Sequence, residues 1–164
     1  MATFGKTLDQ MKQIRPLLLI ATLFILVTAA CKKSSTTTPS PTATVGMTFT
    51  FNGIAETSNL VLATWTKSLN SIQIIGSNGT QGLNLMFSSP KVGTFDIATD
   101  PTIIASFSTA TDFNHTYFGS TGKIVITTFT SDTIAGTFQF SGANALSQAG
   151  VITNGTFTAK LTTY

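Results

Sequence analysis

Few side chains in this sequence can perform acid–base or nucleophilic chemistry. The chain has 164 residues, with one cysteine and one histidine. A serine hydrolase needs a nucleophile, a base and an orienting group that can meet. His115 is the single candidate base of that kind, and the turn sequences GSNG and GSTG do not form the G-x-S-x-G nucleophile elbow. We therefore interpret His115 as a polar loop residue and predict that the protein is not an enzyme.

The acidic residues offer one rival, enzymatic interpretation. The acids that follow Val45 are Glu56, Asp96, Asp100, Asp112 and Asp132. A glycosidase needs two carboxylates at a defined separation, and Glu56 could pair with Asp96 or Asp112 in a weak hydrolase or accessory protein. Asp96, Asp100 and Asp112 are also calcium candidates without EF-hand spacing. One histidine cannot close a zinc site, so we predict no metal and no cofactor.

Residue types suited to binding concentrate in the segment 98–122. It mixes aromatic rings with amide, carboxylate and imidazole groups, a composition that suits carbohydrate, and long ordered loops are often functional. The candidate ligand-binding residues are Phe113, Asn114, His115 and Tyr117, with Trp65 as a separate aromatic platform. The alternative is that residues 103–107 and 115–118 are two further strands whose aromatic rings fill the core. Likewise, a single Trp is more often a half-buried edge residue.

The elements that must position these residues are strands. Apolar residues alternate with polar ones at period two, and β-branched and aromatic residues are enriched. The clearest segments are MTFTF (47–51), SIQI (71–74), LNLMF (83–87), KIVITTF (123–129), IAGTFQF (134–140) and GTFTAKL (155–161). The alternation predicts an all-β domain over residues 46–164, an antiparallel β-sandwich or barrel-like domain of about eight or nine strands.

Turn sequences divide these strands at short intervals. Asn-Gly pairs at 52–53 and 78–79 are typical of hairpin turns. A third pair, Asn154–Gly155, falls inside the last strand and predicts a β-bulge. Residues 122–129, 134–141 and 151–161 predict a three-stranded meander, and residues 144–149 could form a single helical turn.

The N-terminal residues have the organisation of a secretory signal. A basic stretch, MKQIRP at 11–16, precedes the apolar run LLLIATLFILVTAA at 17–30. That run has 14 residues, whereas a spanning helix needs about 20. We therefore predict a signal peptide over residues 1–30, with Met11 as a candidate natural start. Oligomeric state is left open by the sequence.

The segment TAAC, Thr28–Cys31, resembles the lipobox of bacterial lipoproteins. The resemblance implies cleavage before Cys31 and acylation of its sulfur, for example by palmitate. Several acyl chains on one residue hold a protein stably to a membrane. Residue 32 is Lys and not the Asp of inner-membrane retention, which implies the outer membrane. Whether the domain faces the periplasm or the cell surface stays open.

Residues 31–45 are expected to be a tether between the lipidated Cys31 and the β domain. The sequence KKSSTTTPSPTATV has no periodic apolar residues, and its prolines favour extended backbone. Most basic residues of the chain precede residue 45. The remainder carries four basic and five acidic residues, a net charge of −1, so nucleic acid is excluded as an expected partner.

The C-terminal part resembles small lipoproteins of the Bacteroidota. The resemblance rests on GKIVITTF, IAGTFQFSGAN and VITNGTFTAKL within residues 122–161, and on GTFDI at 93–97. It implies a compact β-sandwich or barrel behind a lipid anchor and brings no catalytic residues. Asp132–Ile134 (DTI) also resembles the acceptor sequence for O-glycosylation in these bacteria, with Thr133 as the modified residue.

The sequence thus predicts a cell-envelope protein with a non-enzymatic binding or structural role. Its expected partners are the membrane, through the lipid anchor, and a glycan or an envelope protein. A second alternative is a carrier of a small apolar ligand, because thirteen Phe in so short a chain could line a barrel cavity.

Overall fold

The computed structural model describes residues 44–164. The predicted signal peptide, Cys31 and the tether to Ala43 lie outside the described residues. Among the described residues, no helix has the length and apolar character needed to cross a membrane.

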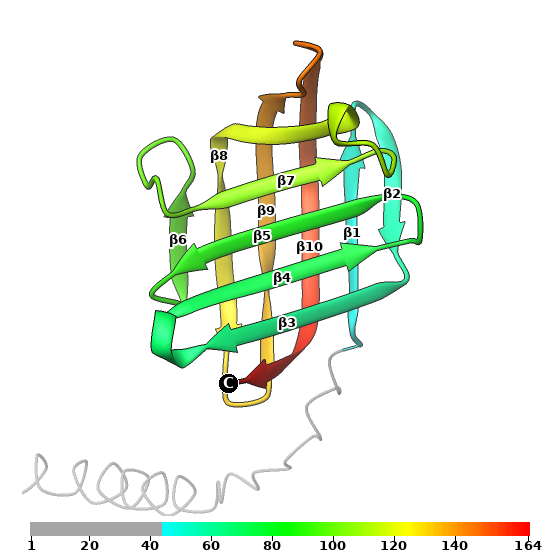
Figure 1. Ribbon diagram of the computed structural model, residues 1–164. Helices are drawn as coiled ribbons and strands as arrows, with labels where there is room; N and C mark the ends of the chain where they lie inside the picture. The colour runs from blue at the N-terminus through cyan, green and yellow to red at the C-terminus, as the bar shows by residue number, and fades with distance from the viewer. Residues whose placement is uncertain (1–43) are drawn as a thin grey trace, which may run out of the picture. The chain divides into compact units, whose positions relative to one another are not determined.

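The described residues form ten β-strands and two short 3₁₀ turns, with no α-helix among them (Figure 1). The strands are β1 Gly46–Phe51, β2 Ile54–Ser58, β3 Leu60–Thr66, β4 Ser71–Ser77, β5 Gly82–Ser88, β6 Gly93–Asp96, β7 Ile104–Ser108, β8 Thr116–Phe129, β9 Thr133–Ala143 and β10 Ala149–Thr163. The 3₁₀ turns are η1 Lys67–Leu69 and η2 Phe113–His115. The all-β prediction is therefore confirmed. The structure has ten strands where the alternation predicted about eight or nine. β2 carries too little apolar alternation to be recognised from the sequence, whereas β7 lies in a segment for which a strand was the alternative interpretation.

Seven strands close into a barrel in the order β3, β4, β5, β7, β8, β9 and β10. The closing contact is the parallel pairing of β10 with β3, in which Leu161 lies beside Ala63 and Thr163 beside Trp65. The other pairings around the barrel are antiparallel, including the predicted meander β8–β9–β10. Closure pairs backbone N–H and C=O groups that the edge strands of an open sheet would leave exposed.

Three further strands extend the barrel, and the whole domain then consists of two layers. The strands of one layer run crosswise to those of the other (Figure 1). β1 and β2 add to β10, and β6 adds to β8, so the rear layer reads β2-β1-β10-β9-β8-β6. The front layer reads β3-β4-β5-β7. β8 belongs to both layers, because residues 116–118 pair with β7 and residues 123–126 pair with β6. A register shift at 119–121 and Gly122 at φ 130° lie between these two stretches.

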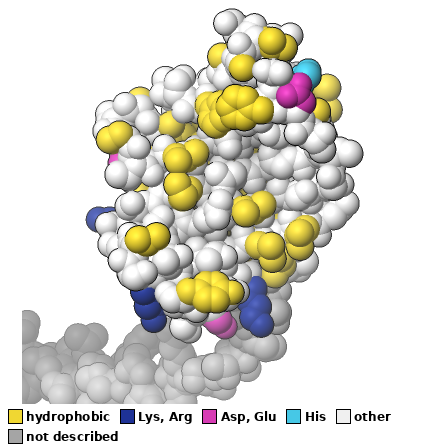
Figure 2. Space-filling view, viewed as in Figure 1, with side chains coloured by type: hydrophobic (Ala, Val, Ile, Leu, Met, Phe, Trp, Pro, Cys, Tyr) yellow, Lys and Arg dark blue, Asp and Glu magenta, His cyan; other side chains and the backbone are white. Residues whose placement is uncertain are grey.

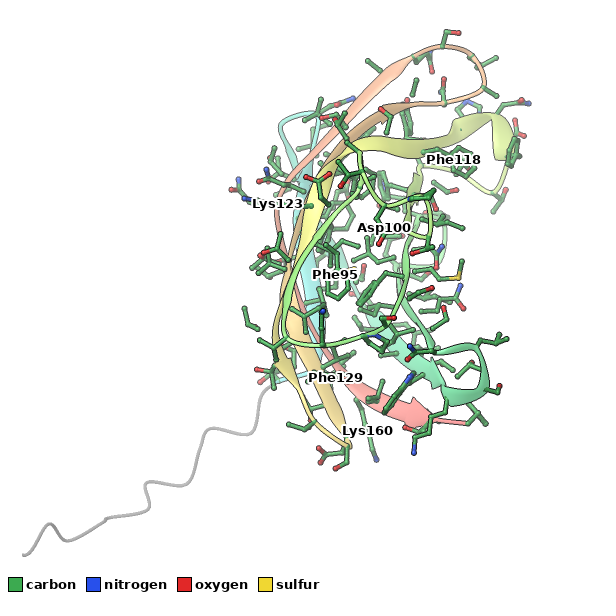
Figure 3. All side chains as sticks on the ribbon, turned by 90° about the vertical axis from the view of Figure 1, so that its left-hand side faces the viewer. Phe95, Asp100, Phe118, Lys123, Phe129 and Lys160 are labelled. Atoms are coloured by element: carbon green, nitrogen blue, oxygen red, sulfur yellow. The ribbon has the colours of Figure 1, made fainter. Side chains whose placement is uncertain are left out.

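The core fills the space between the two layers (Figure 3). Buried residues include Ile72, Ile74, Leu85 and Ile124, each with no exposed surface. Aromatic rings join strands of different layers. They pack in the pairs Phe49–Phe107, Phe51–Tyr117 and Phe87–Phe95, with 4.4 to 5.1 Å between ring centroids. The many phenylalanines therefore serve packing.

Two local predictions have opposite outcomes. The bulge is confirmed, because the β9–β10 register shifts between Ile152 and Gly155, where Asn154 has φ 53°. The helical turn at 144–149 is wrong. There the buried Asn144 side chain accepts hydrogen bonds from the backbone N–H groups of Leu146 and Gln148, and its amide donates to the Gln148 side chain. These bonds stabilise a hairpin turn in place of a helix.

Candidate binding face

The front layer presents one row of side chains to the core and the other to solvent, because residues alternate along a strand. One solvent-facing row crosses five strands in register and consists of Leu62, Ile75, Asn84, Ser106 and Phe118. The next row consists of Thr64, Gln73, Met86 and Ile104. We call these two rows, together with Leu60, the outer face.

Large apolar side chains of the outer face are exposed. Leu60 and Leu62 expose 53% and 51% of their surface, Phe118 exposes 42% and Ile104 41%. Figure 2 shows hydrophobic side chains distributed over this side of the molecule, with charged groups toward its margins. Single exposed apolar residues are ordinary, but a group in register on one sheet is typical of an interaction surface.

The outer face is also free of charge. Strands β3, β4, β5 and β7 contain no Lys, Arg, Asp, Glu or His, and neither does the start of β8 at residues 116–118. Its polar groups are hydroxyls and amides. Near the middle, Gln73 Nε2 donates a 2.9 Å hydrogen bond to Asn84 Oδ1. Depletion of charge and enrichment in apolar groups characterise the centre of protein interfaces.

The turn η2 borders one end of the outer face. The ring of Phe113 packs on Phe118 with 5.6 Å between centroids, and 65% of Phe113 is exposed. The Asp112 carboxylate caps the turn by accepting hydrogen bonds from the backbone and side chain of Asn114. These bonds, with a smaller contribution from His115, lower the pKa of Asp112. His115 Nδ1 lies 3.4 Å from Asp112 Oδ2.

The candidate ligand residues of segment 98–122 are divided between this end and the core. Phe113 and Asn114 are exposed, and His115 is half-buried. Tyr117 is buried, and its ring packs on Phe51. Residues 104–108 and 116–118 are strands, so the two-strand alternative describes this segment correctly. The ring of Tyr117 is therefore part of the core and not of the outer face.

Trp65 lies on the core side of β3, opposite the outer face. It alternates with the buried Val61 and Ala63 and packs against the core, half-buried. Its ring meets Phe129 edge-on at 5.3 Å between centroids, and Lys67 Nζ lies 5.3 Å from the ring centroid. Its backbone carbonyl accepts a hydrogen bond from the N–H of Tyr164. These contacts hold the C-terminus of β10 against β3.

Glu56 and Asp96, one of the two candidate carboxylate pairs, lie far apart. Glu56 lies on β2 and accepts a 3.3 Å hydrogen bond from Gln81, while Asp96 lies on β6, at the opposite end of the rear layer. Five strand spacings separate β2 from β6, about 24 Å, which is too far for a glycosidase pair. Within residues 44–164, no three residues among His, Cys, Asp and Glu come together as a metal site.

A hollow of about 530 Å³ lies beside β6 and includes Asp96 and Asp100 in its lining, together with Lys91 and threonine hydroxyls. Asp96 caps a turn through the backbone N–H groups of Ala98 and Thr99. Asp100 accepts from the hydroxyl and backbone N–H of Thr102. In Figure 3, Asp100 lies on the loop after β6, while Phe95 points between the layers.

The exposed side of the rear layer has a different composition. A row in register consists of Thr57, Thr48, Thr156 and Thr137, in which the Thr48 and Thr156 hydroxyls lie 3.0 Å apart. Lys123 points outward from this layer (Figure 3). Thr133, the candidate glycosylation residue, begins β9 at the β8–β9 turn, and its backbone N–H donates to the Thr130 hydroxyl. Thr137 thus gives a matched polar control for the outer face.

A family model described as "Domain of unknown function (DUF6252)" matches residues 58–159. The chain belongs to this family. The matched region begins at the end of β2 and includes β3 to β9 and most of β10, so it spans the closed barrel. No curated protein matches the DUF6252 chain, and no solved structure matches it either.

The sequence of β3 and β4 contains a signal for the outer face. In Leu60–Ala63 every residue is apolar, so β3 carries apolar side chains on both sides. Ile74 and Ile75 do the same in β4. A strand with one side on a core and the other in water normally alternates with polar residues. Apolar residues on the second side therefore indicate a second contact surface.

Proposed function

We propose that this protein is a lipid-anchored binding module of the cell envelope, without catalytic activity, whose outer face engages a protein partner. The anchor is the acylated Cys31, placed in the outer membrane by the lipobox-like TAAC and the lysine that follows it. Residues 31–45 tether the barrel to the lipid. The observation that carries the binding role is the charge-free, apolar outer face of the front layer.

The aliphatic character of the outer face favours a protein over a glycan. Aromatic rings can stack on the apolar faces of a carbohydrate, but two candidate platforms, Trp65 and Tyr117, pack on the core. The exposed apolar groups are mostly Leu and Ile. Aliphatic groups surrounded by hydroxyls and amides match the centre and rim of a protein interface.

A glycan is the second candidate, favoured by the end of the outer face at η2. Phe113 and Phe118 offer two exposed rings, and Asn114 adds amide donors and acceptors beside them. Phe113→Ala would abolish glycan binding there and leave a protein contact centred on Leu62 and Ile75 intact. The carrier alternative has no comparable support, because the rings of Phe49, Phe107 and Phe138 occupy the interior.

Anchoring is tested by Cys31→Ser in cells. We expect the protein to move from the detergent phase to the soluble fraction, because the sulfur that carries the acyl chains is lost. Unchanged partitioning would refute the anchor. Protease treatment of intact cells, with a periplasmic protein as control, then determines which side of the outer membrane the barrel faces.

The binding face is tested by site-specific photo-crosslinking in the full-length protein. A photoreactive residue at Ser106, in the outer face, is compared with one at Thr137 on the rear layer. We expect discrete protein adducts from position 106 and few from position 137. Equal adduct formation at both positions would contradict a dedicated binding face. A glycan-binding assay on the wild type and Phe113→Ala distinguishes the second candidate.

A further inference from the structure

The charge of the outer face indicates which kind of protein it can bind. This inference rests on the proposal above that the outer face is the binding surface. Neither of its two rows contains an ionisable side chain. A partner with a strong charge of either sign gains no ion pair here and would lose hydration of its own charges. The best electrostatic match is therefore another uncharged, partly apolar sheet.

We propose that this sheet is the outer face of a second copy of the same chain. Two copies that meet through this face have no like charges opposed and no charge buried. The contact is isologous, since each copy contributes the same residues across a two-fold axis. Two sheets that pack face to face with interdigitating aliphatic side chains form the arrangement of a β-sandwich core.

The dimensions of the outer face set the size of such a contact. β3, β4 and β5 have seven residues each, which corresponds to about 23 Å in length. Five neighbouring strands, counting the start of β8, are separated by four spacings and span about 19 Å. The footprint is then roughly 440 Å² per copy and roughly 900 Å² for two copies, a size typical of weak, reversible protein contacts.

The polar groups near the centre of the outer face can form hydrogen bonds with the same groups of a second copy. The Gln73–Asn84 hydrogen bond uses one amide N–H and one carbonyl oxygen. The remaining Asn84 N–H groups and the Gln73 carbonyl oxygen provide a donor and an acceptor on each copy. A two-fold axis near these residues brings the donor of one copy to the acceptor of the other, twice. Leu62 and Ile75 on one side and Ile104 on the other then pack around this pair.

The first test uses full-length protein in its membrane, with two differently tagged copies expressed together. Ser106→Cys places a thiol in the outer face, and Thr137→Cys places one on the rear layer. A short bis-maleimide reagent should cross-link the two tags through position 106 and not through position 137. The Thr137→Cys protein also carries Cys31, so it measures any background from that residue.

The second test uses charge. Ile75→Asp on both copies should weaken co-purification of the two tags at least about tenfold, because two unpaired carboxylates would face the interface. Thr137→Asp should leave it unchanged. An Ile75→Asp copy expressed with an Ile75→Lys copy should recover association, which a misfolded variant would not do. Recovery supports the proposal, and no recovery with both variants folded by circular dichroism contradicts it.

The outcomes separate this inference from the proposed function. Adducts at position 106 that contain a different protein, and never the second tag, overturn the self-association and leave the binding role in place. Equal or absent adducts at positions 106 and 137 overturn both. Tag-to-tag adducts confined to position 106 support both.

Discussion

The ring of Phe107 meets the ring of Phe49 edge-to-face, with 5.1 Å between centroids and 78° between planes. Phe49 belongs to β1 in the rear layer and Phe107 to β7 in the front layer. Both are buried, with 5% and 1% of their surfaces exposed. This contact joins the layers at a position where the strands themselves are not hydrogen-bonded. It makes the stability of the barrel dependent on two rings that are 58 residues apart in sequence.

Phe107→Ala should lower the free energy of unfolding by about 3 to 5 kcal/mol, because it removes a buried ring and leaves a cavity between the layers. Urea unfolding can be followed by the fluorescence of Trp65, the single tryptophan. Phe113→Ala is the control, since Phe113 is 65% exposed, and it should change stability by less than about 0.5 kcal/mol. Similar losses for both variants would contradict the role given to Phe107.

Gly136→Ala should destabilise the protein by about 1 to 3 kcal/mol through overpacking. A Cβ atom at Gly136 would overlap the backbone carbonyl of Val125 and lie 3.1 Å from the Phe157 ring. Gly82→Ala, also in a strand, is the matched control because nothing lies within 4 Å of its added Cβ. Thermal unfolding of both variants checks this, and a neutral Gly136→Ala would show that β8 and β9 can separate locally.

Asn154→Val should cost about 1 to 2 kcal/mol, whereas Asn154→Gly should be close to neutral. Asn154 forms the bulge in β10 with φ 53°, a left-handed conformation that Asn and Gly accept and β-branched residues resist. The comparison is made by urea unfolding of the two variants. If Val were tolerated as well as Gly, the bulge would not require this conformation.

Thr102→Val should raise the pKa of Asp100. The Thr102 hydroxyl donates to Asp100 Oδ1 at 2.7 Å and the Thr102 N–H donates at 2.9 Å, and both bonds lower the pKa of this carboxyl below 3.8. Because the folded-state pKa is the lower one, the resulting stability is present above about pH 3.8 and is lost as pH falls through the folded-state pKa. Carboxyl titration by NMR measures the change.

The control for this titration is Asp112, whose lowered pKa depends on Asn114 and not on Thr102. Its midpoint should be the same in wild type and Thr102→Val. A shift of both carboxyls would indicate a general change of structure, and no shift of Asp100 would mean that the hydroxyl bond is not formed in solution.

The sequence by itself determined the all-β class, the bulge at Asn154–Gly155 and the meander at the C-terminus. These follow from alternation at period two and from local turn chemistry, which act over a few residues. The sequence also favoured a signal peptide and a lipidated Cys31, in residues that the structure does not describe.

Only the tertiary structure decided the closure of the barrel and the location of the candidate face. The parallel pairing of Leu161 with Ala63 joins residues almost 100 positions apart, and no local pattern encodes it. The same holds for the row that brings Leu62, Ile75 and Phe118 together across strands. Tyr117 is in the core and Phe118 outside because β8 alternates as it pairs with β7. The sequence left both a binding loop and two strands open for this segment, and only the pairing with β7 decides for strands. Register between distant strands depends on which side chains pack best over the whole core, so it is a property of the folded domain.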